Sequence, residues 1–170
     1  MKVLIVVDMQ NDFIDGSLGN KESEAIIPNV EKKILEWEGL VVATQDTHQD
    51  NYLNTQEGKN LPIVHCVMGT RGWELHPTIK NALEKKHAQV INKSTFSSVP
   101  LAMMLIPCGV REIHVVGLCT DICVISNAFL LKAHLPEVPI FVDSSCCAGV
   151  SKEKHEAALE TMRSCQINVQ

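Results

Sequence analysis

The chain has 170 residues, of which 45% are hydrophobic, and this suits one domain over residues 1–170 with a substantial core. A net charge of −5 and only 4% aromatic residues argue against nucleic-acid binding, because phosphates need a basic stripe and bases need stacking platforms. The apolar run Met1–Val7 is too short for a signal peptide or a membrane span. We therefore expect a soluble, cytoplasmic protein that binds neither nucleic acid nor membrane.

Apolar, β-branched runs alternate with segments of helical periodicity along the chain. The runs that we interpret as buried strands are Val3–Val7, Leu40–Thr44, Gln89–Asn92, Ile113–Gly117, Val138–Val142 and Ile167–Val169. The helical segments are Ile26–Trp37, Thr78–Lys85, Pro100–Ile106, Asp121–Lys132 and Ser151–Ser164. This alternation predicts βαβ units and a parallel sheet. The polar stretch Gln45–Arg71 does not fit it, and a loop of that length is usually functional.

Seven cysteines are many for a chain of this length. Their odd number and the lack of a secretory signal argue against a disulfide framework, and the lack of a CxxC pair argues against a thiolate zinc site. Most of them are expected to be small buried hydrophobic residues. A redox role for the vicinal pair Cys146 and Cys147, expected at a strand end and loop, is an alternative, which is disfavoured because adjacent thiols form strained bridges.

Reactive side chains follow several of the predicted strands at the point where each strand ends. Asp8 ends the first strand, Lys93 follows the third long strand, and the segment Gly117–Cys123 follows the fourth and opens an apolar helix. Ligands of open parallel sheets bind beyond the carboxyl ends of the strands. We therefore expect these residues, far apart in the sequence, to converge on one edge of the sheet.

Cys123 is the candidate nucleophile. A helix start and a nearby lysine favour a thiolate, and together they can lower a thiol pKa from ~8.5 to ~3.5–7.5. Asp8 can act as the base, and the backbone N–H groups of Cys119 and Cys123 can bind an oxyanion. The alternatives are a buried structural cysteine, an aspartate that caps or pairs locally, and a solvated Lys93 at a strand end.

A second candidate site lies in the polar stretch. Asp46 and His48 form an Asp-x-His pair, and His65 follows later in the chain. Carboxylate and imidazole groups are ligands for zinc, iron or manganese, and this set with open positions would make a catalytic metal site. The alternative is ordinary hydrogen bonding within a loop.

Four segments together resemble the isochorismatase-like cysteine hydrolases, and within them the nicotinamidases. They are Val6–Phe13, Asp46–His48, Lys93–Ser97 and Gly117–Val124, and they occur in the family's order over nearly the whole chain. The resemblance implies a three-layer αβα fold with a six-stranded parallel sheet. It also implies a cis peptide bond between Leu118 and Cys119.

The resemblance further implies a catalytic triad of Asp8, Lys93 and Cys123, with the N–H groups of Cys119 and Cys123 as the oxyanion hole. The thiolate would attack a carboxamide carbon, ammonia would leave, and water would hydrolyse the thioester. A small aromatic carboxamide is the expected substrate, and a homo-oligomer is compatible with the family analogy. The alternatives are a relative that acts on another amide, a carbamoyl group or an isochorismate-type vinyl ether, and a non-catalytic binding domain, which the intact triad disfavours.

The sequence departs from the commonest nicotinamidase pattern in its metal segment. No second histidine follows the Asp-x-His pair within residues 49–54. Some related sequences use a later glutamate, so the resemblance implies a divalent transition metal held by Asp46, His48, Glu57 and His65. Asp50 is the competing carboxylate.

The segment Leu61–Ile63 also lacks the aromatic residue that often stacks on the substrate in this family. The segment therefore departs from the family's pattern for binding a nicotinamide ring. Phe13 and Phe96 are the remaining candidates for contact with a substrate ring.

Overall fold

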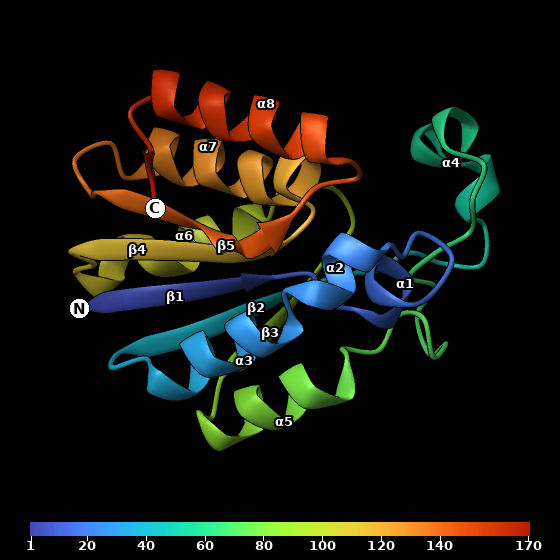
Figure 1. The fold of residues 1–170 in the computed structure, drawn as a ribbon, viewed down its shortest axis with the longest axis horizontal. Coiled ribbons are helices and arrows are strands. Elements are labelled where there is room, and N and C mark those ends of the chain that lie inside the picture. The colour runs from blue at the N-terminus through green and yellow to red at the C-terminus, as the bar shows by residue number, and fades with distance from the viewer.

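The computed structural model describes all 170 residues and confirms the parallel sheet (Figure 1). Its six strands are β1 (Lys2–Val7), β2 (Leu40–Asp46), β3 (Gln89–Lys93), β4 (Glu112–Leu118), β5 (Ile140–Ala148) and β6 (Asn168–Val169). They lie in the order β3-β2-β1-β4-β5-β6, and every neighbouring pair is parallel. The chain order reverses between β1 and β4, so the carboxyl ends of these strands border the crevice where such sheets bind ligands.

Helices cover both faces of the sheet, which confirms the three-layer αβα fold. They are α1 (Asn11–Ile14), α2 (Lys21–Ala25), α3 (Ile27–Glu36), α4 (Gln56–Asn60), α5 (Pro77–Lys85), α6 (Val99–Leu105), α7 (Ile125–His134) and α8 (Lys152–Ser164). Short 3₁₀ segments are η1 (Tyr52–Asn54) and η2 (Ile106–Cys108), and a π-helical turn, η3 (Thr120–Val124), precedes α7. Figure 1 shows α3 and α5 on one face, α7 and α8 on the other, and α4 projecting beyond the carboxyl ends of the strands. No helix has the length and apolarity needed to cross a membrane.

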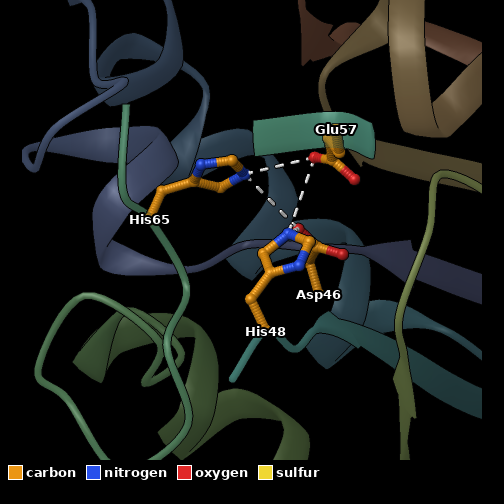
Figure 2. A group of neighbouring side chains, drawn as sticks. All are labelled: Asp46, His48, Glu57 and His65. Atoms are coloured by element: carbon orange, nitrogen blue, oxygen red, sulfur yellow. Dashed lines mark ion pairs between the residues drawn. The ribbon is translucent and has the colours of Figure 1, made fainter. Parts of the chain in front are cut away.

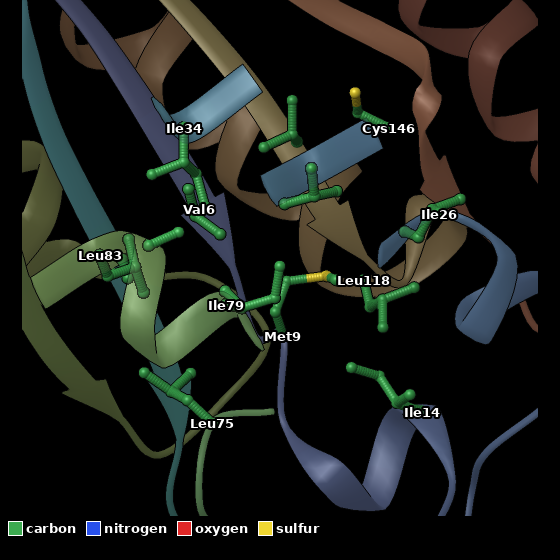
Figure 3. Packing of buried hydrophobic residues seen from close by; sticks show 14 of the residues in the cluster. Val6, Met9, Ile14, Ile26, Ile34, Leu75, Ile79, Leu83, Leu118 and Cys146 are labelled. Carbon is green, nitrogen blue, oxygen red and sulfur yellow. The ribbon is translucent and has the colours of Figure 1, made fainter. Parts of the chain in front are cut away.

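The position of β1 inside the sheet, with a core cluster on each face, explains why its sequence is apolar at every position rather than at every second one. Leu4 and Val6 pack into the cluster formed with α3 and α5, part of which Figure 3 shows, whereas Val3, Ile5 and Val7 pack into the cluster formed with α6, α7 and α8. Successive side chains of a strand point to opposite faces, so a strand covered on both faces must be apolar at every position. All five side chains are fully buried.

The β1 and β4 backbones approach each other closely at their carboxyl ends. Gly117 pairs in register with Val7 and has a φ of +118°. A Cβ atom at this glycine would lie 2.1 Å from the carbonyl oxygen of Val7. Only glycine fits such an approach, which brings the residue after β1 close to the turn that follows β4.

The strand predicted at Val138–Val142 differs from the observed β5, which begins at Ile140 and continues to Ala148. The prediction ended too early because residues 143–145 are polar. The extension places Cys146 and Cys147 inside the strand, where they join the core clusters on opposite faces. All seven cysteines are free thiols.

Candidate active site and metal cluster

Asp8 lies directly after β1 and is completely buried. Its φ of +46° is a left-handed conformation, which few non-glycine residues adopt. The Thr44 hydroxyl donates a 2.7 Å hydrogen bond to Oδ1, and the Lys93 ammonium lies 2.6 Å from Oδ2. Burial raises the pKa of Asp8 above its ordinary value, although Lys93 opposes this effect. The result is a buried carboxylate with a heightened affinity for a proton.

Lys93, the last residue of β3, joins the candidate catalytic groups. Its Nζ donates a 2.9 Å hydrogen bond to the carbonyl oxygen of Thr95, and it lies 3.5 Å from the Sγ of Cys123. It also lies 3.3 Å from Asp46, its in-register neighbour on β2. Burial alone would lower the pKa of Lys93, but the charges around it, that of Asp8 first, raise the pKa above its ordinary value. The side chain is therefore a buried ammonium shared by two carboxylates and a thiol.

Cys123 lies in the π-helical turn η3, and the peptide bond between Leu118 and Cys119 is cis, as expected. The expected low thiol pKa is wrong. Complete burial of the thiol and then the charge of Asp8 hold the pKa of Cys123 well above its ordinary value, and Lys93 offsets this only in part. The helix start and the lysine are visible in the sequence, whereas the depth of burial, which outweighs them, is not. The resting thiol keeps its proton, so it needs a base before it can act as a nucleophile.

The polar stretch brings the four expected metal ligands together (Figure 2). One ligand atom from each of Asp46, His48, Glu57 and His65 lies within 4.8 Å of all the others. Both histidines direct Nε2 toward the two carboxylates, at distances of 3.0 to 3.7 Å. The competing carboxylate, Asp50, is exposed and does not belong to this group.

The backbone holds these ligands in place. The backbone N–H of His48 donates to the carbonyl oxygen of Cys66, and the carbonyl oxygen of His48 accepts from the N–H of Met68. These two bonds form a parallel bridge that places the His65 segment beside His48. The Nδ1 of His65 lies 2.8 Å from the carbonyl oxygen of Ile63, so Nε2 is left to face the cluster.

The four residues fit a divalent metal ion. The Nε2 of His48 is buried and makes no hydrogen bond, even though Asp46 lies 3.0 Å away. A buried ring nitrogen without a hydrogen bond, facing two carboxylates and a second imidazole, is what a metal ligand requires before the ion is bound. Two nitrogen and two oxygen donors suit zinc, iron or manganese.

A cavity of about 740 Å³ lies between the metal cluster and the residues that flank Lys93 and Cys123. Its lining includes His48 and Glu57 on one side, and Ser94–Phe96 and Ile122 on the other. Of the two expected ring contacts, Phe96 lines this cavity. Phe13 does not; it is buried, with its ring centroid 5.6 Å from that of His65.

Two supporting residues were not identified as site residues from the sequence. Thr44 holds Asp8, as described above. Gln10 is fully buried, accepts the backbone N–H of Asp46 at 2.7 Å and donates to the carbonyl oxygen of Asp46 at 2.8 Å. A polar side chain within or just after a buried strand is the signal that could have identified both, because such a group needs a partner.

The fold and the site define a class: an α/β protein with aspartate, lysine and cysteine in contact beside a four-ligand cluster at the carboxyl ends of a parallel sheet. The family model of the isochorismatase domain matches residues 2–170. The chain therefore belongs to the isochorismatase family.

Within this family the chain is similar to nicotinamidases. It is 34% identical to a nicotinamidase/pyrazinamidase of Mycobacterium tuberculosis, over 99% of this chain and 98% of that protein. The pyrazinamidase of Pyrococcus horikoshii in complex with zinc matches with 30% identity and a TM-score of 0.83, covering 99% of this chain and 98% of that one. PnC1 from L. infantum in complex with nicotinate matches with 26% identity and a TM-score of 0.87, covering 100% of this chain and 92% of that one.

Proposed function

We propose that the protein is a metal-dependent amidohydrolase of the nicotinamidase type, which converts a small carboxamide to the acid and ammonia. The observation that carries this proposal is the buried Lys93 ammonium, 2.6 Å from Asp8 and 3.5 Å from the thiol of Cys123. The cavity next to it is lined by residues that flank both Lys93 and Cys123, so an amide bound there can approach the thiol.

Asp8 is the proposed base. Its raised pKa suits a group that must first accept the proton of Cys123 and later deliver it to the leaving amine. Lys93 stays protonated and stabilises first the thiolate and then the negative charge that develops during attack.

Cys123 then forms a tetrahedral adduct with the carboxamide carbon, and the N–H groups of Cys119 and Cys123 are the proposed donors to its oxyanion. Collapse of the adduct breaks the C–N bond and leaves a thioester. The leaving amine takes the proton that Asp8 accepted from Cys123 and departs as ammonia. Asp8 then activates the water that hydrolyses this thioester, so the carboxylate acts as base in both halves of the reaction.

Asp46, His48, Glu57 and His65 would hold a divalent cation at the edge of the same cavity. Zinc is the first ion to test, because the P. horikoshii relative was solved with zinc. When bound, the cation supplies a Lewis acid that can polarise or orient a substrate group.

Nicotinamide is the first candidate substrate, since the relatives named above are nicotinamidases or pyrazinamidases or, in one case, were solved with nicotinate. A second candidate is a carboxamide without an aromatic ring. The lining of the cavity favours it, because apart from the imidazole of His48 the only ring is Phe96, whose side chain is exposed.

The test is ammonia release from a panel of small amides, nicotinamide first, by protein supplied with zinc, iron or manganese. Cys123→Ala should abolish turnover of every substrate, whereas Cys165→Ala, which alters an exposed thiol, should leave it unchanged. Retained turnover in Cys123→Ala would exclude the nucleophile. Absence of turnover on the whole panel in the wild type would exclude the proposed activity.

A further inference from the structure

Asn127 lies on α7, one helical turn after Cys123, and its side chain is fully buried. Its Nδ2 donates to the carbonyl oxygen of Cys123 at 2.8 Å and to that of Phe96 at 3.1 Å. Its Oδ1 accepts the backbone N–H of Ser98 at 3.0 Å. One amide thus uses both of its donor hydrogens and its acceptor on two separate parts of the chain.

One of these two parts carries the Cys123 thiol, and the other follows Lys93, whose ammonium lies 3.5 Å from that thiol. Cys123 belongs to the turn after β4, whereas residues 94–98 follow Lys93 at the end of β3 and lead into α6. Strand order places β2 and β1 between β3 and β4, so no backbone pairing joins these strands directly. The Asn127 amide is a direct hydrogen-bonded link between the segments that follow them.

The segment held by Asn127 also holds Lys93. The carbonyl oxygen of Thr95 accepts a 2.9 Å hydrogen bond from the Lys93 ammonium, and the neighbouring Phe96 and Ser98 are the residues that Asn127 binds. Phe96 also lines the cavity. A shift of this segment relative to α7 would therefore move both the ammonium and one side of the cavity away from the thiol.

We infer that Asn127 is a positioning residue that fixes the Lys93 segment and the side of the substrate cavity against the nucleophile turn. It touches no reacting atom and acts through the Cys123 and Phe96 carbonyl oxygens and the Ser98 N–H. This inference rests on the proposed amidase function for its kinetic consequence, but the link itself is independent of the reaction.

The chemistry of the link explains why an amide is required. A leucine at this position has nearly the same shape but leaves the Ser98 N–H and the carbonyl oxygens of Cys123 and Phe96 without this partner. An aspartate would place a carboxylate, which has no donor, against two carbonyl oxygens. A threonine can donate one hydrogen bond and accept one, so it can restore only part of the link.

The kinetic test compares Asn127→Leu and Asn127→Thr with the wild type, using nicotinamide hydrolysis and urea unfolding. Val142→Ala is the matched control, because it removes buried volume from the core cluster that contains Cys123 without altering a polar group. We expect kcat to fall roughly tenfold or more in Asn127→Leu, since small misplacements of reacting groups cost that much or more, and to recover in part in Asn127→Thr. Val142→Ala should lose stability but keep kcat within about twofold. A kcat for Asn127→Leu equal to that of Val142→Ala would overturn the inference.

A second measurement keeps the inference testable if nicotinamide is not hydrolysed or if Asn127→Leu does not fold. The rate at which chloroacetamide modifies Cys123, followed by mass spectrometry of the peptide that contains it, reports on the thiol without turnover. We expect slower modification in Asn127→Thr than in the wild type, because the thiol is no longer held against Lys93. An unchanged or faster rate would overturn the inference, whereas a wild type that reacts with chloroacetamide but hydrolyses no amide would contradict only the proposed function.

Discussion

Replacing Lys93 by methionine measures what the buried ammonium contributes to the fold. In the wild type its Nζ lies 2.6 Å from Asp8, which has no exposed surface, and 3.3 Å from Asp46. Methionine keeps an unbranched stem but leaves both carboxylates without a counter-charge. Removal of one partner of a buried ion pair costs about 3–5 kcal/mol. In a chain of this size each kcal/mol lowers the Tm by about 2–4 °C, so we expect a fall of roughly 6–20 °C.

The assays are thermal unfolding, for the Tm, and urea unfolding, for the free energy of unfolding, both followed by circular dichroism for the wild type, Lys93→Met, Asp8→Asn and the double variant. Asparagine at position 8 keeps an acceptor for the Thr44 hydroxyl, which donates a 2.7 Å hydrogen bond there. The double variant should be clearly more stable than Lys93→Met, because the pair is then removed as a unit and no charge is left unpaired at position 8. A loss of less than about 1 kcal/mol in Lys93→Met, or simple additivity of the two single variants, would refute this reasoning.

Three further predictions follow from other parts of the molecule. Glu57→Ala should weaken zinc binding about tenfold or more in a chelator competition, whereas Asp50→Ala, which alters the exposed competing carboxylate, should bind zinc as the wild type does. Lys33→Met should cost about 0.5–1 kcal/mol near pH 6, and this difference from the wild type should begin to shrink as the pH falls below 3.8 and vanish once the pH is below the lowered pKa of Asp143, as acid unfolding curves would show. The reason is that burial raises the pKa of Asp143, but Lys33 and Ser145 lower it by more, so the net shift is downward. The carboxylate therefore contributes stability that is lost as the pH falls through this lowered pKa. Gly117→Ala should give little folded protein on size-exclusion chromatography, because its Cβ would lie 2.1 Å from a backbone oxygen of β1; a native-like elution and Tm would contradict the close approach of the two strands.

The strands of the sheet could be predicted because burial on both faces leaves an unmistakable pattern. The run Val3–Val7 is apolar at every position for this reason, and the parallel order then brings Asp8, Lys93 and Cys123 to one edge. The final residues of β5 could not be predicted, since Asp143–Ser145 are polar and half-buried or exposed.

The details of the site depended on quantities that residue types do not carry. Only the resemblance to relatives pointed to Glu57 as a metal ligand. It lies in a long polar loop, and such a loop has no periodic pattern from which the position of a side chain could be predicted. The pKa of Cys123 depended on depth of burial, which outweighs the helix start and the lysine. Asn127 lies in an apolar helix, and its sequence position does not reveal that its amide contacts the segment after another strand.

The absence of a side chain at Gly117 limits where the chain can vary if it is to accept a different substrate. With no atom between the β1 and β4 backbones, the carboxylate after one strand and the thiol after the other are set at a spacing that the strands themselves cannot adjust. Variation that adapts the cavity to a different amide must therefore arise elsewhere, in lining residues that belong neither to the sheet nor to the metal cluster: Thr55, Gln56, Asn60, Leu61 and Ser94–Phe96. A variant library built on these lining residues therefore leaves the spacing of Asp8 and Cys123 untouched while it changes the surface that a bound amide would contact.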